Sequence, residues 1–344
     1  MKWKRWRIKM TSWEYWPMWV LYVPVVFQHF YLALKAKSLF FFLKVNPAIK
    51  EGFILSDEKY TSLKLVPEEN RPKTILIEKG KSLSDISDAL KKNAIEFPII
   101  VKPNIGFRGV LVKLCEKVDD LKGIDFNKTS YIIQEYIDFP VEVGVFYYRF
   151  PNSLSGFIPS ITLKEFLSIT GDGISTFSEL IEQKPRAFLQ YDKLKNTFFD
   201  TWDKVIPKGE IIKLENIGNH NRGTKFINGN HIIDEALLKV FDELSFKMKG
   251  FYFGRFDIRT SSIADLKKGK NFKILEVNGV GAEATHIYDP NYRLLDAWRE
   301  TLFLWRIAFN IAMENKQKGE QFPVFSDAKK RYLQYKNYKK VALS

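Results

Sequence analysis

The sequence predicts an α+β protein whose globular body is preceded by a hydrophobic, mainly helical N-terminal segment. In the body, stretches of alternating apolar and polar residues, typical of half-buried strands, lie between stretches with the spacing of amphipathic helices. The N-terminal segment differs in charge: residues 15–34 contain no charged side chain, whereas 27% of the whole chain is charged. With 344 residues, the chain can bury a substantial core in one large domain or in two to three lobes.

The single cysteine limits the chemistry that is open to this chain. Cys115 has no second cysteine to pair with, which excludes an intramolecular disulfide and any zinc site built from several cysteines. A lone thiol suits a reducing compartment. We therefore expect a cytoplasmic protein.

The net charge of +14 is concentrated at the two ends. Residues 1–9 contribute +5, and residues 316–344 contribute +6, which leaves about +3 for the body. A nucleic-acid-binding domain more often carries a basic stripe across its folded face, so we expect no nucleic-acid partner. Anionic phospholipid is the better candidate partner for the ends. A solvated C-terminal tail without a partner is the alternative for residues 316–344.

The N-terminal segment has the composition of a membrane-interface element. Five of the eight tryptophans, at positions 3, 6, 13, 16 and 19, lie in it among Lys and Arg residues. Residues 15–34 are near the length that spans a bilayer, but Pro17, Pro24, Gln28 and His29 argue against a spanning helix. We rank a segment lying on the inner membrane surface first, packing against the body or against a second subunit in a homodimer second, and a transmembrane helix third.

Residues 254–290 read as two short strands joined by a basic loop. The first strand places Arg255 and Asp257 on one face, and the second places Glu276 and Asn278 on one face, because side chains two apart share a side. Three oxygen-bearing side chains therefore converge across the strand pair, and magnesium prefers such ligands. A hairpin with a polar outer face is the alternative.

The middle of the chain alternates strands and helices. We expect strands at residues 74–77, 97–102, 110–114, 131–137 and 141–150, and helices at residues 82–93, 176–181 and 234–248. Thr176 and Glu179 form the capping box of the second helix. Residues 215–230 read as a polar loop that includes Arg222, either holding an anionic substrate or turning at the surface.

Several polar residues in this region have the pattern of a nucleotide site. Lys102 ends a strand next to Gly106 and Gly109, which is a plausible phosphate clamp, although a plain hairpin turn is the alternative. The P-loop motif is absent. The run Gln134-Glu135-Tyr136-Ile137 follows a hydrophobic strand and could offer backbone groups to an adenine ring, with Glu142 accepting from ribose hydroxyls. Most single acids of this kind merely face water.

In their order along the chain, these motifs resemble the ATP-grasp superfamily, in particular the branch that contains D-alanine–D-alanine ligase. The motifs are Lys102-Pro103, residues 134–137, Glu142, Gly-Arg-Phe-Asp at 254–257, Leu-Glu-Val-Asn at 275–278, and Thr285-His286 with Pro290. Residues 171–181 are also similar to a segment of cyanophycin-synthetase-like ATP-grasp proteins. The resemblance covers residues 56–315 and implies two α+β lobes that grip ATP, a small lobe at about 95–140 and a large lobe at about 141–315. Residues 1–55 precede them, and a basic tail at 316–344 follows.

The resemblance implies a ligase that joins a carboxylate to an amine through an acyl phosphate, using ATP and one or two Mg²⁺ ions, with Mn²⁺ as the alternative metal. The substrates would be a small or amphipathic carboxylate and amine. The implied roles are phosphate contacts for Lys59, Lys102, Gly106 and Gly109, adenine contacts for Gln134, Glu135, Tyr136 and Ile137, ribose contacts for Glu142, metal ligation for Asp257, Glu276 and Asn278, and catalysis for Arg255, which would stabilise the oxyanion, and Arg222.

The sequence departs from the family pattern in two places. The first domain of the family is not recognisable, and the Trp- and Phe-rich segment stands in its place. The loop after Asn278 reads Gly-Val-Gly-Ala-Glu, where D-alanine ligases usually carry a Pro-Gly turn. We therefore do not expect D-alanine specificity. Two alternative functions are a kinase of a small polyol or lipid headgroup with the same ATP site, and a non-catalytic nucleotide-binding protein at the membrane.

Overall fold

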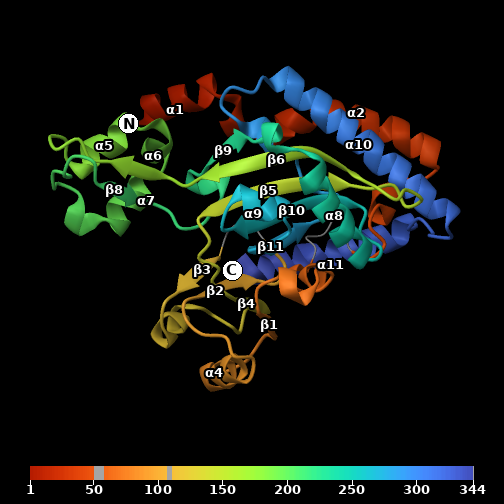
Figure 1. Ribbon diagram of the computed structural model, residues 1–344, viewed down its shortest axis with the longest axis horizontal. Helices are drawn as coiled ribbons and strands as arrows, with labels where there is room; N and C mark the ends of the chain where they lie inside the picture. Colours follow the sequence, from red (N-terminus) through yellow and green to blue (C-terminus); the bar gives the residue numbers. More distant parts are fainter. Residues whose placement is uncertain (50–57, 107–110, 344) are drawn as a thin grey trace.

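The computed structural model describes residues 1–49, 58–106 and 111–343. A five-stranded sheet forms the large lobe, a four-stranded sheet forms the small lobe, and a compact insertion projects from the large lobe (Figure 1). In Figure 1 the helices α1 (Lys2–Thr11), α2 (Met18–Ala36) and α10 (Leu294–Gln317) lie above the large sheet, and the small lobe lies below it. The predicted α+β class is confirmed.

The large sheet is antiparallel, with the strand order β11-β10-β5-β6-β9. Its strands are β5 (Val141–Tyr148), β6 (Phe157–Glu165), β9 (Lys225–Asn228), β10 (Phe253–Thr260) and β11 (Phe272–Asn278). The two strands predicted within residues 254–290 are therefore confirmed, and the short helix α9 (Ile263–Lys267) lies in the loop between them. The prediction that residues 215–230 are all loop is partly wrong, because residues 225–228 pair with β6 as the edge strand β9.

Alternation along β5 and β10 gives the sheet two different faces. Val143, Val145 and Tyr147 on β5 and Phe256 and Ile258 on β10 point to one side. There they pack against α8 (Glu235–Lys247), whose N-cap is Asp234 as the predicted helix requires, and against α9. This cluster is the core of the large lobe.

The opposite face of the sheet is divided along its length. At one end Phe146, Tyr148 and Phe253 are covered by α2 and α10 and by the helical turn η2 (Phe41–Lys44). At the other end the same face carries Glu142 and Asp257, which lie on a cavity. The change from aromatic to charged residues along one face therefore positions the polar site.

The small lobe is an antiparallel sheet with the order β1-β4-β2-β3. Its elements are β1 (Thr74–Ile77), α4 (Leu83–Lys92), β2 (Ile99–Pro103), β3 (Lys113–Cys115), the helical turn η5 (Val118–Gly123) and β4 (Tyr131–Glu135). The helix α4 is capped by Ser82 and Asp85 and packs through Ile86 and Leu90. Because β1 and α4 belong to this sheet and its core, the lobe begins well before the predicted boundary at residue 95. The short helix α3 (Lys59–Leu63) joins it to the large lobe, since the Lys59 amide donates to the Asn104 carbonyl and Leu63 packs in the large-lobe core.

Residues 166–214 form an insertion with its own core. It contains the strand pair β7 (Ser168–Thr170) and β8 (Ile211–Lys213) and the helices α5 (Phe177–Gln183), α6 (Pro185–Leu189) and α7 (Tyr191–Thr197). Phe177, Leu194 and Trp202 are buried at its centre. The predicted capping box of Thr176 and Glu179 is confirmed at the start of α5.

The N-terminal segment packs against the body through only part of its surface. Leu21, Val25 and Leu32 of α2 are buried, Val25 and Leu32 in a cluster with α10. The opposite side of α2 is exposed to solvent: Phe27 retains 74% and Leu34 retains 80% of its accessible surface. Among the described residues, α2 is the one helix whose length and composition would allow it to cross a membrane.

The predicted C-terminal tail is helical over the residues that the structure describes. After α10 the chain forms a second helix, α11 (Phe325–Leu343). The Tyr338 hydroxyl of α11 contacts the Thr129 hydroxyl and donates to the Ile105 carbonyl of the small lobe. The basic C-terminal residues are therefore part of a helix that touches the small lobe.

Candidate active site

A cavity of about 610 Å³ lies between the two lobes. Its walls come from β2 and β4 of the small lobe, from the polar end of the large sheet, from α3, and from the N-terminal segment. Twelve of the fourteen sequence-predicted site residues line it: Lys59, Lys102, Gly106, Gln134, Glu135, Tyr136, Ile137, Glu142, Arg255, Asp257, Glu276 and Asn278. Gly109 lies outside the described residues. The remaining residue, Arg222, is treated below.

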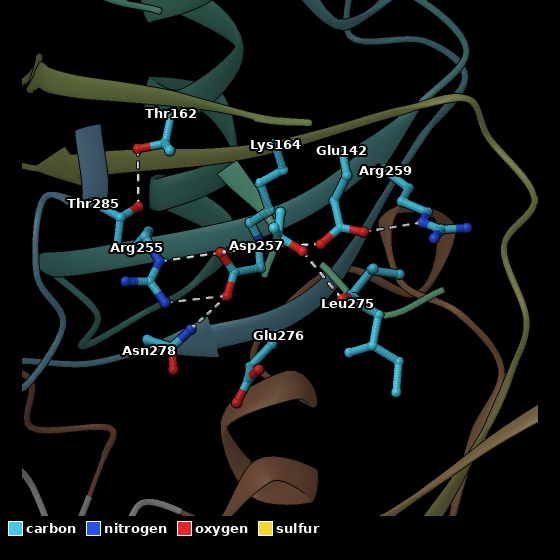
Figure 2. A network of polar contacts seen from close by, with 12 residues as sticks. Glu142, Thr162, Lys164, Arg255, Asp257, Arg259, Leu275, Glu276, Asn278 and Thr285 are labelled. Carbon is cyan, nitrogen blue, oxygen red and sulfur yellow. Dashed lines mark hydrogen bonds and ion pairs between the residues drawn. The ribbon is translucent and has the colours of Figure 1, made fainter. Parts of the chain in front are cut away.

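Asp257, Glu276 and Asn278 share one face of the β10–β11 pair. Asp257 lies opposite Glu276, and Arg255 lies opposite Asn278. The Asn278 side-chain amide donates to Asp257 Oδ2 at 3.2 Å (Figure 2). A bulge follows Asp257 in the pairing, but the three pairs before it keep their register, so the period of two places the three side chains on one face. Their role as metal ligands stays a prediction.

Arg255 makes a two-pronged contact with Asp257. Its Nε donates to Oδ1 at 3.0 Å and its Nη2 donates to Oδ2 at 3.2 Å, while Nη1 donates to the Glu283 carbonyl at 3.1 Å (Figure 2). Gly144 lies opposite Asp257 on β5, and a Cβ there would be 3.3 Å from Arg255 Cδ. The absence of a side chain at position 144 therefore leaves room for the guanidinium group.

Lys164 on β6 is a buried cation that the sequence analysis missed. Its Nζ lies 2.9 Å from Glu142 Oε1 and 3.4 Å from Asp257 Oδ1. The other oxygen of Glu142 accepts from Arg259 Nε at 3.2 Å. Figure 2 shows the resulting chain of alternating charges, from Arg255 through Asp257, Lys164 and Glu142 to Arg259. Since both oxygens of Glu142 already contact cations, a ribose contact for this residue stays a prediction.

The network controls the protonation of its members. Burial raises the pKa of Asp257, but Arg255 and Lys164 more than offset this effect and hold the pKa well below its usual range. Burial likewise lowers the pKa of Lys164, while Asp257 and Glu142 more than compensate and raise it. Asp257 is therefore a carboxylate and Lys164 an ammonium group at neutral pH.

Lys102 has the opposite electrostatic environment. It is buried at the end of β2, where its Nζ donates to Gln134 Oε1 at 3.2 Å and to the Leu275 carbonyl at 3.1 Å. Burial, and after it the charge of Lys59, lower the pKa of Lys102 to about 7, although Asp257 and Glu142 act in the opposite direction. A lysine in this state gains its full charge when an anion binds beside it.

Lys59 of α3 contacts the carboxylate of Glu276 on β11. Its aliphatic end passes close to Gly106, where a Cβ would lie 2.6 Å from Lys59 Cε. The structure therefore brings Lys59, Gly106 and Glu276 to one place in the cavity.

The segment from Glu135 to Ile137 connects the small lobe to β5. The Glu135 carboxylate accepts from the Lys73 amide at 2.9 Å, and the Tyr136 amide donates to the Pro98 carbonyl at 3.3 Å. Arg259 holds the segment from the large lobe, because its Nη1 donates to the Ile137 carbonyl at 2.6 Å and its guanidinium lies 5.1 Å from the Tyr136 ring centroid. The adenine contacts of this segment stay a prediction.

Arg222 is not among the described residues that line the cavity. It ends the helical turn η7 (His220–Arg222), with Nη2 donating to the Val112 carbonyl at 3.3 Å and Nη1 lying 3.4 Å from Glu215 Oε1. It therefore ties the loop at 215–230 to the far end of the glycine loop. Its catalytic role stays a prediction.

A buried cluster at the other end of the cavity was also missed by the sequence analysis. Glu14, in the helical turn η1 (Trp13–Tyr15), forms an ion pair with Arg186 of α6, and its Oε2 lies 3.1 Å from His220 Nε2. The Trp13 indole nitrogen donates to the Tyr292 carbonyl at 2.6 Å. The N-terminal segment is thereby fixed to the insertion, to the 215–230 loop and to the turn before α10. The one feature of the sequence that could have indicated a role for Glu14 is its position as an acid in a tryptophan-rich segment.

The donor set fits a magnesium ion. Among the described residues no three acidic, histidine or cysteine side chains form a metal-binding group. Asp257, Glu276 and Asn278 instead offer two carboxylates and one amide on one face of the neighbouring strands β10 and β11. Magnesium is commonly held by one or two carboxylates and completes its shell with water and substrate phosphates. The identity of the ion stays a prediction.

Solved structures of several ligases and synthetases are similar to this chain. A D-alanine–D-alanine ligase from Bacillus anthracis has 17% identity and a TM-score of 0.43, with 76% of this chain and 69% of that chain covered. A bifunctional glutathione synthetase from Pasteurella multocida has 16% identity and a TM-score of 0.40, with 71% and 36% covered. An N5-carboxyaminoimidazole synthetase from Staphylococcus aureus has 12% identity and a TM-score of 0.40, with 67% and 46% covered. The chain thus spans about a third of the length of the glutathione synthetase.

Comparison with curated protein sequences gave no significant match. Residues 56–145 match the family model of the RimK-like ATP-grasp domain. This match contains α3, the small lobe and the start of β5, and with them the eight predicted nucleotide-contacting residues that line the cavity. Over these residues the chain is similar to the RimK-like ATP-grasp domain.

Proposed function

We propose that this protein is an ATP-dependent ligase that joins a carboxylate to an amine through an acyl phosphate. One observation carries the proposal: cationic side chains and carboxylates from both lobes line one cavity of an ATP-grasp fold. They include Lys59, Lys102, Lys164, Arg255, Asp257 and Glu276. Phosphoryl transfer depends mainly on positioning and on neutralising charge at the phosphate oxygens, and such a set supplies both.

The two lobes have separable tasks in this proposal. The small lobe and the segment from Glu135 to Ile137 hold the nucleotide, and Lys102 and Lys59 meet its phosphates. The large sheet holds the γ-phosphate end, because Asp257, Glu276 and Asn278 lie there. Those three residues would hold Mg²⁺, which supplies charge neutralisation at the β- and γ-phosphate oxygens.

The proposed reaction has two steps, phosphorylation of the carboxylate and displacement of the phosphate by the amine. A substrate carboxylate oxygen attacks the γ-phosphorus, which forms the acyl phosphate and breaks the bond to the β-phosphate oxygen, releasing ADP. The amine nitrogen then attacks the acyl carbon, and the carbon–oxygen bond to phosphate breaks, giving the amide, inorganic phosphate and a proton. Arg255, which lines the cavity beside Asp257, stabilises the negative charge that develops on the acyl oxygen.

The test uses hydroxylamine as a general amine, because it converts an acyl phosphate into a stable hydroxamate. Purified protein with ATP and Mg²⁺ is screened against carboxylic acids for ADP release and hydroxamate formation. Asp257→Asn and Glu276→Gln should each lower the rate by about 10²–10³-fold. Glu243→Gln, on the exposed side of α8, makes the same chemical change away from the cavity and should leave the rate unchanged.

Two results would contradict the ligase proposal. ADP release with a stable phosphorylated alcohol, detected by mass spectrometry, would identify a kinase. Binding of ATP without ADP release under any substrate would identify a nucleotide-binding protein. Equal turnover in Asp257→Asn and the unchanged protein would remove the proposed metal site.

We further propose that α1 and α2 hold the protein on the anionic inner surface of the membrane. Support comes from the exposed side of α2, which presents Trp19, Phe27 and Leu34, and from the exposed Trp3 and Trp6 of α1. Basic residues of α1 accompany them, and Lys4 and Arg5 also bind α1 to the insertion through Glu182 and Asp192. Tryptophan and basic residues beside an apolar face are typical of helices that lie in the membrane interface.

The membrane proposal is tested by sedimentation with vesicles. The protein should pellet with vesicles that contain phosphatidylglycerol and remain in the supernatant with phosphatidylcholine alone. The double variant Phe27→Ser/Leu34→Ser should lower binding about tenfold or more, because each exposed side chain loses its burial in the interface. Phe199→Ser, at an exposed aromatic residue of the insertion, is the matched control. If the protein does not bind anionic vesicles and light scattering shows a dimer, the exposed side of α2 is instead an interface with a second copy of the chain.

A further inference from the structure

The lining of the cavity includes two chemically different groups of residues. One is the network of Lys164, Arg255 and Asp257 on the large sheet. The other belongs to the N-terminal segment and consists of Trp13, Trp16, Pro17, Met18, Val20 and Leu21. The volume of about 610 Å³ is in the range of small-molecule sites, and these sites are usually apolar with a few placed polar groups. The arrangement is therefore that of a site for a molecule with one polar and one apolar end.

The apolar wall is continuous with the exposed side of α2. Met18 and Leu21, three residues apart at the start of α2, line the cavity, whereas Trp19 between them does not line it and keeps 68% of its surface exposed. Trp16 is at the junction, because it lines the cavity and also keeps 38% of its surface exposed. Its indole nitrogen donates to the Lys9 carbonyl at 3.0 Å, which fixes the ring beside α1. Trp16 is therefore an apolar side chain of the N-terminal segment that meets both the cavity and the solvent.

The polar groups near this wall are already engaged with one another. Glu14 contacts Arg186 and lies 3.1 Å from His220, and the Tyr288 hydroxyl donates to Glu283 at 2.7 Å. Apolar surface therefore remains the main chemical feature of the wall itself. A carboxylate, by contrast, can meet the cations Arg255 and Lys164, which line the same cavity on the large sheet.

We propose that the acid substrate of the ligase is amphipathic: its carboxylate lies at Arg255, and its apolar chain lies against Trp16, Met18 and Leu21. This proposal rests on the ligase activity proposed above. The N-terminal segment then has two linked tasks, since its outer side meets the membrane and its inner side receives the chain of a molecule that comes from the membrane. Trp16 and Met18 determine specificity by contacting the chain and do not contact the reacting atoms.

The test measures chain-length dependence with n-alkyl carboxylates from butanoate to dodecanoate, kept below their critical micelle concentrations. With ATP, Mg²⁺ and hydroxylamine, kcat/KM for hydroxamate formation should rise about fourfold for each methylene group that the wall buries. Trp16→Ala and Met18→Gln should flatten this dependence, so that the rates for the longer acids fall toward the rate for butanoate. Trp19→Ala, at the neighbouring exposed tryptophan, should keep the full dependence. A rate independent of chain length in the unchanged protein would overturn the proposal and leave the ligase assignment intact.

A binding measurement separates this proposal from the ligase assignment. Calorimetric titration of dodecanoate and butanoate into the protein with a non-hydrolysable ATP analogue and Mg²⁺ needs no turnover. If dodecanoate binds more tightly than butanoate, and if this difference is lost in Met18→Gln but retained in Trp19→Ala, the apolar wall binds the chain. This result supports the proposal even if no hydroxamate forms with any acid. Equal affinities for the two acids would contradict the proposal. Equal losses of dodecanoate affinity in Met18→Gln and Trp19→Ala would also contradict it. Because Met18→Gln nearly preserves side-chain volume at the first turn of α2, it is the variant to interpret if Trp16→Ala unfolds.

Discussion

Lys59 of α3 and Glu276 of β11 form an ion pair inside the cavity, so a candidate phosphate ligand and a candidate metal ligand neutralise each other. Asp257 is neutralised in the same way by Arg255 and Lys164. Charges that are taken out of water are costly unless they are paired, which explains why these side chains pair with one another. In the function proposed above, binding of a metal–nucleotide complex would exchange these internal pairs for contacts with phosphate and metal.

Replacing Lys59 should have opposite effects on two ligands. In Lys59→Met, Glu276 loses its competing cation, so Mn²⁺ used as a probe without nucleotide should bind about tenfold more tightly, a change of about 1.4 kcal/mol. ATP should bind more weakly because a phosphate contact is lost. Calorimetry gives both affinities, and Lys64→Met on the exposed end of α3 is the control. A parallel change of both affinities would show that Lys59 does not compete with the metal.

Nucleotide binding should be accompanied by proton uptake at Lys102. Its pKa of about 7 is lowered by burial and by Lys59, and phosphates beside it should raise the pKa again. Below pH 7 the group is already protonated, so affinity should be constant. Above pH 7 binding must supply the proton, so affinity should fall as the pH rises. Calorimetry at pH 8 in buffers of different ionisation enthalpy should show an uptake approaching one proton.

The control for this prediction is Lys102→Arg, which keeps a charge at every pH and should abolish the uptake. Facing the Lys102 group are Lys59, Asp257 and Glu142. Equal proton uptake in Lys102→Arg would assign the linkage to another group.

Glu14 should stabilise the fold much more than an exposed acid does. Its ion pair with Arg186 is buried on both sides, so Glu14→Ala leaves a buried guanidinium without its carboxylate. The expected loss in the free energy of unfolding is about 3–5 kcal/mol. Urea denaturation measures it. Glu69→Ala, which removes an exposed pair with Lys247, should give no measurable change. A small effect of Glu14→Ala would mean that the N-terminal segment is only loosely attached.

Gly218 should tolerate no side chain while Glu142 is present. A Cβ at position 218 would overlap the Glu142 carboxylate, which Lys164 and Arg259 hold in place. Gly218→Ala should therefore lower the thermal unfolding temperature and weaken ATP binding. Adding Glu142→Asp shortens the side chain, so the double variant should lose less stability than the sum of the single changes. Strict additivity would indicate that the loop at 215–230 moves freely away from Glu142.

Strand periodicity explains why much of the site could be predicted. Arg255, Asp257, Glu276 and Asn278 are spaced two apart within two strands, and residues two apart in a strand share a face whatever surrounds them. The helices at 82–93 and 234–248 were predictable for the same kind of reason, because their caps and apolar stripes are local. The ordered motifs then identified the superfamily to which the matched domain belongs.

Residues whose importance depends on neighbours far along the chain were not predictable. Lys164 reads as one polar residue in a strand, and only the pairing of β6 with β5 places it between Glu142 and Asp257. Glu14 becomes a buried partner of Arg186 only when the N-terminal segment folds over the insertion, 172 residues away in sequence. The boundary of the small lobe was misplaced because β1 joins its sheet beside β4, from which it is distant in sequence.

The sequence by itself determined the strands, the helices, the charged face of β10 and β11, and the apolar, tryptophan-rich character of the N-terminal segment, since these depend on residues that are close along the chain. The tertiary structure alone decided which charges meet, and which sides of the N-terminal segment face the cavity, the body and the solvent. The physical reason is that charge pairing and burial are set by distances through space, and chain connectivity fixes those distances only after the sheets and helices have packed.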